Sequence, residues 1–148
     1  MSSQSVALNT TNALTVNSDL SKIFIGDNRY ENDSYINNSS YNPITLLAGT
    51  VLGRISSSGI MVPCNASATN GSQYPVGILA EDIMVPAGTT RKVALCIGGD
   101  VAEEKVIFFE GNTLETVVDN RRYRDRIKGD TLGINLVPGT EMTAYDNQ

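Results

Sequence analysis

The sequence predicts a small, mostly β protein with one short helix. Short β-prone apolar runs are separated by glycine and proline, and a single segment has the apolar spacing of a helix. Charged residues make up 18% of the 148-residue chain, below the usual share of roughly a quarter. The remaining polarity comes from Asn, Ser and Thr, which favour turns and strand surfaces over helix interiors. The length fits one domain with an extended arm.

The N-terminal part differs from the rest of the chain. Residues 1–22 are polar, with scattered apolar positions and no sustained period, and are expected to form a flexible arm. Residues 23–148 are then the β-rich domain. This domain begins with a short apolar run, residues 23–25. The following stretch, residues 27–42, is dense in turn-forming residues but carries several tyrosines, so we expect irregular β structure or an ordered loop.

Short strands are expected through the middle of the chain. Ser57-Ser58-Gly59 is typical of a tight hairpin turn. Gly98-Gly99 follows another apolar run and is expected to form a turn rather than a phosphate-binding loop, because no helical pattern follows it. The expected strands span residues 44–47, 51–55, 60–62, 76–79, 83–85, 93–97, 106–109 and 132–137. The expected core consists of Leu52, Ile55, Val62, Val76, Ile78, Leu79, Val93, Leu95, Ile97, Val101, Ile107 and Leu136.

One segment, residues 113–129, predicts a helix. Its N-terminus is expected at Thr113 or, alternatively, at Thr116, because threonine side chains cap helices. Gly129 is expected to end it. The apolar stripe of this helix would consist of Val117, Val118, Tyr123 and Ile127.

The charge of the chain argues against nucleic acid and membrane as partners. The net charge is −5 and the pI about 4.6, whereas phosphate contacts need clustered Lys and Arg. No apolar run is long enough to span a bilayer, and the first residues lack the basic and apolar regions of a secretory signal. Asp119 and Asp125 dilute the one basic cluster, so we interpret it as a solvated helix face. This cluster is Arg121, Arg122, Arg124, Arg126 and Lys128.

An enzyme is not expected, and neither is a cofactor or a metal. The chain has no His, the commonest general base and metal ligand. Cys64 and Cys96 form no CxxC motif and are expected to be buried free thiols, with a disulfide as the less favoured alternative. The pairs Glu81-Asp82 and Glu103-Glu104 are expected to lie at the surface, because neighbours along a strand point to opposite faces. Weak Ca²⁺ binding by residues 27–33 is a disfavoured alternative to a plain loop.

A set of motifs follows in one order along residues 44–107. They are AGTVLGR at residues 48–54, a hairpin glycine at 59, NGSQ at 70–73, VGIL at 76–79 with ED at 81–82, and GDV at 99–101. In this order and spacing the sequence resembles the lambda-type head decoration proteins of tailed bacteriophages. Residues 24–28, 124–134 and 141–143 resemble larger members of that family, so the resemblance covers most of the chain.

The resemblance implies a β-clip-like fold and a homotrimer seated at three-fold positions of the capsid. It implies an arm that orders on the major capsid protein by adding a strand to a sheet edge. The protein would be a capsid cement protein on the outer surface of the virion head, made in the host cytoplasm, that stabilises the expanded shell. The longer ends, residues 1–42 and 110–148, leave their own roles open. The expected capsid-binding residues are Leu14, Val16, Leu20, Ile23, Phe24 and Ile25.

One alternative comes from another functional class: a virion-surface module that binds carbohydrate or a receptor, as in a head fibre or tail spike. Tyrosine side chains can stack on sugars. Local packing at strand surfaces is the favoured role of the same side chains. The tyrosines in question are Tyr30, Tyr35, Tyr41, Tyr74 and Tyr145.

Overall fold

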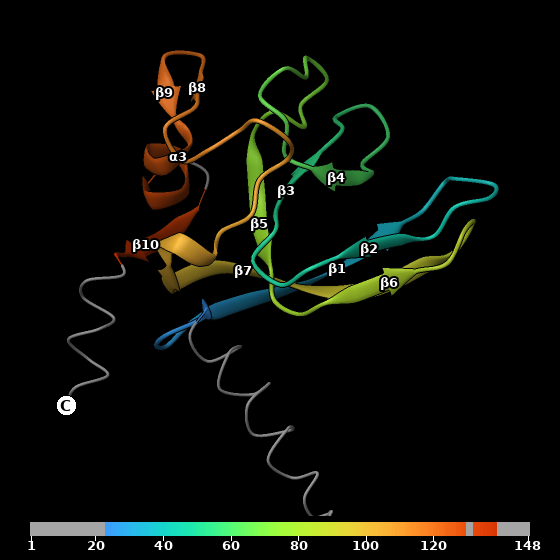
Figure 1. Cartoon of the computed structure of the whole chain (residues 1–148), viewed down its shortest axis with the longest axis horizontal. Helices are drawn as coiled ribbons and strands as arrows, with labels where there is room; N and C mark the ends of the chain where they lie inside the picture. Colours follow the sequence, from blue (N-terminus) through green and yellow to red (C-terminus); the bar gives the residue numbers. More distant parts are fainter. Residues whose placement is uncertain (1–22, 130–131, 139–148) are drawn as a thin grey trace, which may run out of the picture.

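The computed structural model describes residues 23–129 and 132–138 and is mostly β, as predicted (Figure 1). The predicted short helix is present as α3 (Tyr123–Gly129), and one turn of 3₁₀ helix, η1 (Glu103–Lys105), follows the longest strand. The more specific β-clip arrangement stays a prediction. The boundary between an arm and a domain at residue 22 also stays a prediction, because residues 1–22 lie outside the described part of the chain.

The main sheet is built around β7. The order is β1-β7-β5-β3-β4, and a sixth strand, β10, pairs with β7 beyond β5. β1 runs antiparallel to residues 90–98 of β7, whereas β10 runs parallel to residues 98–102. One long strand therefore joins two halves of the molecule. The strands are β1 (Arg29–Ile36), β3 (Val51–Arg54), β4 (Met61–Pro63), β5 (Pro75–Leu79), β7 (Thr90–Ala102) and β10 (Gly133–Val137).

From Val93 onward both faces of β7 are largely buried, which explains the apolar run at residues 93–97. Leu95 and its neighbour Cys96 point to opposite faces and belong to different core clusters. On one face, the ribbon of β2 (Ile44–Leu46) and β6 (Ile83–Val85) packs against the cluster that contains Leu95. On the other face, α3 covers the cluster that contains Cys96, to which Ile134 of the neighbouring strand β10 also belongs.

Most of the predicted strands are confirmed, as is the hairpin between β3 and β4. In that hairpin Ile55 N–H donates to Ile60 O at 2.9 Å, and Gly59 adopts a φ of 75°. The stretch at 27–42, expected to be irregular β structure or an ordered loop, contains both: β1, which has a register shift between Arg29 and Tyr30 and whose Tyr35 is buried, and a hydrogen-bonded loop after it. The predicted strand at 106–109 is wrong. Only Ile107 makes a bridge there, to Thr50, and its side chain is 38% exposed rather than in the core.

The helix prediction is wrong for its first half. Val117–Val118 and Arg121–Arg122 form a small hairpin, β8 and β9, and the helix begins only at Tyr123. The physical reason is the turn between the two strands. Asp119 and Asn120 have φ values of 50° and 67°, a left-handed conformation that breaks a right-handed helix and suits a two-residue hairpin loop.

Gly98 and Gly99 lie inside β7, so the predicted turn is also wrong. Here glycine permits a close approach of backbone to backbone. A Cβ atom on Gly99, whose φ is 107°, would lie 2.6 Å from Asn28 Cα. A Cβ atom on Gly98 would lie 2.4 Å from the Arg29 guanidinium. The two glycines therefore let residues 26–29 cross directly over the strand.

Candidate functional site

Both ends of the described chain lie on the same half of β7. Phe24 forms an antiparallel bridge with Val101, and Ile25 N–H donates to Asp100 O at 2.9 Å. On the opposite edge of the strand, β10 places Val137 beside Ala102. Figure 1 shows both of these segments at the same end of the molecule, at the lower left. We call this region, residues 23–28, 98–102 and 133–137, the terminal end.

A tight turn at residues 26–28 is fixed onto the terminal end by the Asn28 side chain. Asn28 Nδ2 donates to Asp100 O at 2.9 Å and to Cys96 Sγ at 3.4 Å. Asn28 Oδ1 accepts a hydrogen bond from Gly26 N–H at 3.2 Å. These bonds, together with the close approach over Gly99, give the chain one defined path before it enters β1. They set the place and direction from which the preceding residues start.

The structure places three of the six predicted capsid-binding residues. Ile23, Phe24 and Ile25 are partly buried at the terminal end, and the first two pack against the cluster beneath α3 and β10. The Phe24 ring meets the Tyr30 ring edge-on, with centroids 6.0 Å apart. The other three, Leu14, Val16 and Leu20, lie outside the described residues. Capsid binding by all six stays a prediction.

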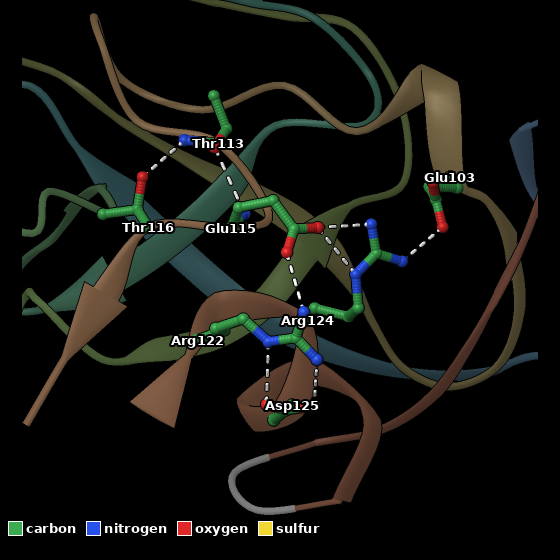
Figure 2. A network of polar contacts seen from close by, with 7 residues as sticks. All are labelled: Glu103, Thr113, Glu115, Thr116, Arg122, Arg124 and Asp125. Carbon is green, nitrogen blue, oxygen red and sulfur yellow. Dashed lines mark hydrogen bonds and ion pairs between the residues drawn. The ribbon is translucent and has the colours of Figure 1, made fainter. Parts of the chain in front are cut away.

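The basic cluster lies on β9 and α3, and carboxylates hold its Arg122 and Arg124 (Figure 2). Arg124 bonds to Glu103 and also to Glu115, the latter through Nη2 to Oε2 at 2.7 Å. Arg122 bonds to the other oxygen of Glu115 at 2.8 Å and to Asp125 at 3.2 Å. Hydrogen bonds from both arginines, that of Arg124 first, lower the pKa of the Glu115 carboxyl. These pairs neutralise much of the local positive charge.

Two further contacts show that this cluster holds the β8–β9–α3 segment in place. Glu115 is positioned by a local turn, in which its N–H donates to Thr113 Oγ1 at 3.1 Å. Arg126 is buried, donates to Val118 O at 2.6 Å and lies 5.0 Å above the Tyr74 ring. The interpretation as a solvated helix face is therefore wrong for Arg126, because the helix is shorter than predicted and turns this side chain inward.

The cysteines are free and buried, as predicted. Cys64 Sγ donates to Tyr123 Oη at 3.4 Å, and Tyr123 Oη in turn donates to Gln73 O at 2.8 Å. Burial raises the pKa of the Cys64 thiol to about 11 and also raises that of Cys96. Because the thiolate is the reactive form, neither side chain has the properties of a nucleophile in the folded protein.

The carboxylate pairs do not converge. Asp82 accepts a hydrogen bond from Ala48 N–H at 2.7 Å, and Glu103 is paired with Arg124. Asp33, from the disfavoured calcium loop, is paired with Arg54. Within residues 23–129 and 132–138, no three His, Cys, Asp or Glu side chains are grouped to hold a metal ion. In the same residues, no helix is long and apolar enough to cross a membrane.

An apolar groove is the feature that sequence reasoning missed. Residues 45–47, Thr50, Pro63 and residues 107–110 line a volume of about 290 Å³, which we call the Phe109 groove. Leu47 and Phe109 are 53% and 42% exposed along it. The sequence signal was the run VIFF at residues 106–109, which was interpreted as a buried strand.

The tyrosines of the carbohydrate alternative do not form one exposed set. Tyr35 is buried in the core, and Tyr74 packs under Arg126, in line with the favoured role of local packing. Tyr30 and Tyr41 are 49% and 89% exposed. Tyr145 lies outside the described residues. No observation on these side chains favours a sugar-binding function.

Comparison with known families gives one match. The model of the family described as "Bacteriophage lambda head decoration protein D" matches residues 26–121, well over half of the chain. A search of curated proteins found no match. The matched region runs from the turn at the terminal end to the start of β9, so α3 and β10 lie beyond it. The resemblance drawn from the motifs is thus confirmed, and the chain belongs to the phage lambda head decoration protein family.

Proposed function

We propose that this head decoration protein is a non-enzymatic cement protein. It binds the outer surface of the capsid as a homotrimer, contacts the major capsid protein, and stabilises the expanded shell. Family membership supports the general role. The observation that carries the proposed mode of binding is the terminal end, where both ends of the described chain lie on one half of β7.

In this mechanism residues 1–22 are the arm that reaches the shell. The alternation Leu14-Thr15-Val16 suits a strand added to an exposed sheet edge, with main-chain hydrogen bonds along its length. Leu20 continues the apolar positions. The partly exposed run at residues 23–25 forms the root of the contact and, through Phe24 and Val101, ties the arm to the body.

Three arms are needed because one arm binds weakly. Ordering a flexible segment costs about 1–2 kcal/mol per residue, which offsets most of what its contacts contribute. Linking arms in a trimer raises the overall affinity, often by a factor of about 10² or more, through effective concentration. A ligand that binds only the expanded shell then stabilises that state by mass action. The mechanism requires no cofactor, nucleic acid or membrane.

Removing the arm tests this function. We expect the protein without residues 1–22 to remain a folded trimer that no longer co-sediments with expanded, empty heads. A sharper variant is Leu14→Asp with Val16→Asp, and its matched control is Thr15→Asp with Asn17→Asp, which puts the same charge on the other side of the strand. The substitutions at Leu14 and Val16 should abolish attachment and the control should not. Full attachment of the truncated protein would refute the arm model.

A further inference from the structure

The loop between β1 and β2, residues 37–43, projects at the far end of the molecule from α3 (Figure 1). Its tip carries Tyr41, whose side chain is 89% exposed. The loop itself is tightly held. Asn37 is buried, and its Nδ2 donates to Asn42 O at 2.8 Å and to Val85 O at 3.0 Å. Ser39 Oγ accepts hydrogen bonds from the N–H groups of Tyr41 and Asn42, at 3.3 and 3.0 Å.

This combination is typical of an interface anchor rather than of a plain surface loop. An aromatic side chain on a pre-ordered backbone loses little conformational freedom on binding. Tyrosine is also enriched among the side chains that contribute most to protein–protein interfaces. Residues 37–43 contain no charged side chain, so burying the loop desolvates no ion. Tyr41 is therefore available to fill an apolar pocket on another subunit.

The Phe109 groove is a suitable acceptor on the same chain. Leu47, Ile107 and Phe109 present partly exposed apolar side chains to it, and Glu110 is the one charged residue among the described ones that line it. Neither Glu110 nor the tip is part of the terminal end, so docking here leaves the proposed capsid-binding region free. A groove and a projecting aromatic side chain on different parts of one surface are the two halves of a head-to-tail contact.

Charge supports the same pairing. Arg91 and Lys92 lie at the start of β7, opposite Tyr35 and Ser34 of β1, and so close to the base of the Tyr41 loop. Both are exposed, and no ion pair is found for either of them within the described ranges. Glu110 is likewise exposed, with no ion pair among those residues. The base of the Tyr41 loop is therefore basic and the groove carries an acidic residue, which is complementary between copies.

We propose that the Tyr41 loop of one copy docks into the Phe109 groove of the next, and that three such contacts close the trimer. A head-to-tail contact forms a closed ring when its rotation divides the full circle. This inference rests on the proposed trimeric function and names the surfaces that would build the trimer. It uses residues that the capsid-binding arm does not.

The test uses the full-length protein and two single variants. Tyr41→Asp removes the aromatic anchor of the loop and leaves the groove intact, whereas Leu47→Asp places a charge in the groove and leaves the loop intact. Each variant alone should be monomeric by sedimentation velocity, with at least a 30-fold rise in the dissociation constant, since truncating an interface anchor costs about 2 kcal/mol or more. An equimolar mixture should form a one-to-one dimer that grows no further, because it restores a single contact. A mixture that stays monomeric would overturn the proposal.

A control variant and the state of the wild type separate this inference from the proposed function. Val117→Asp replaces an apolar side chain that is 60% exposed on β8, away from the tip and the groove, and should stay trimeric. If either test variant fails to fold, Glu110→Lys and the pair Arg91→Glu with Lys92→Glu replace them. Each should again be monomeric alone, whereas their mixture should form mixed oligomers, because the loop of each variant then complements the groove of the other; a mixture that stays monomeric would again overturn the proposal. If the wild type is a trimer and all these variants remain trimeric, only the proposed surfaces are contradicted. A wild-type monomer contradicts the trimer itself.

Discussion

Replacing Gly99 by alanine should destabilise the protein far more than the same change at Gly88, another positive-φ glycine. An alanine at a φ of 107° is strained by about 1–2 kcal/mol, as at any left-handed position. In addition its Cβ would lie 2.6 Å from Asn28 Cα, a backbone atom that can retreat only if the turn at 26–28 moves. That movement breaks the hydrogen bonds of Asn28 Nδ2 and Ile25 N–H to Asp100 O, each worth about 1 kcal/mol. The sum is about 3–4 kcal/mol.

Gly88 offers the matched control. It has a φ of 70°, but a Cβ there would meet nothing within 4 Å. Gly88→Ala should therefore cost only the backbone strain, about 1–2 kcal/mol. Gly98→Ala should also cost less than Gly99→Ala, because Gly98 has no positive φ and its Cβ would press only on the movable Arg29 side chain. Urea unfolding at one fixed protein concentration measures all three. If Gly99→Ala is no worse than Gly88→Ala, the close crossing over β7 does not hold the terminal end together.

Two further predictions concern the ion pairs and the thiols. The pKa of the Glu115 carboxyl is lowered mainly by its hydrogen bond from Arg124, and that of Asp125 by its bond from Arg122. Because these folded-state values lie below the unfolded ones, the stabilisation is complete above about pH 5 and is lost as the pH falls through the lowered values, below about pH 4. Urea unfolding from pH 6 to pH 3 should show that the free energies of unfolding of the wild type and of Arg124→Gln converge at low pH. The control Lys128→Gln should show no such pH-dependent difference from the wild type. Parallel curves of unfolding free energy against pH for the wild type and Arg124→Gln would contradict this. The second prediction concerns Cys64, whose pKa is raised to about 11. We expect this thiol to resist alkylation by iodoacetamide at pH 8 until urea unfolds the chain, which mass spectrometry measures. Rapid labelling of the native protein would contradict this and show that the thiol is accessible.

Local signals were sufficient for most of the sheet. The strands from β2 to β6 are short apolar runs separated by glycine, proline or short polar stretches, and this pattern alone predicts their positions closely. Their partners are not local. Nothing in the run at 93–97 indicates that β7 continues to Ala102 or that β10 pairs with it in parallel. Both features depend on the packing of residues 24–29 and of α3, which are distant in the sequence. The absence of a turn at Gly98-Gly99 is likewise a tertiary effect.

The helix and the groove also show that a local pattern does not decide the structure by itself. The spacing of Val117, Val118 and Tyr123 satisfies a helical stripe, yet Asp119-Asn120 is also a two-residue hairpin signal, and the hairpin forms. In the groove, Phe108 stacks on Tyr123 at 5.1 Å while its neighbours Ile107 and Phe109 are left partly exposed. An apolar run in the sequence cannot show which side chains face the core and which face a partner.

The central claim is that the terminal end faces the shell. Electron microscopy of expanded heads saturated with the full-length protein tests it most directly, at a resolution that separates α3 and the Tyr41 loop from the terminal end. We predict trimers on the outer surface with Phe24 and Val137 nearest the major capsid protein and continuous density leading from residue 23 into the capsid. A body bound through its opposite end, with residue 23 directed away from the shell, would contradict the account.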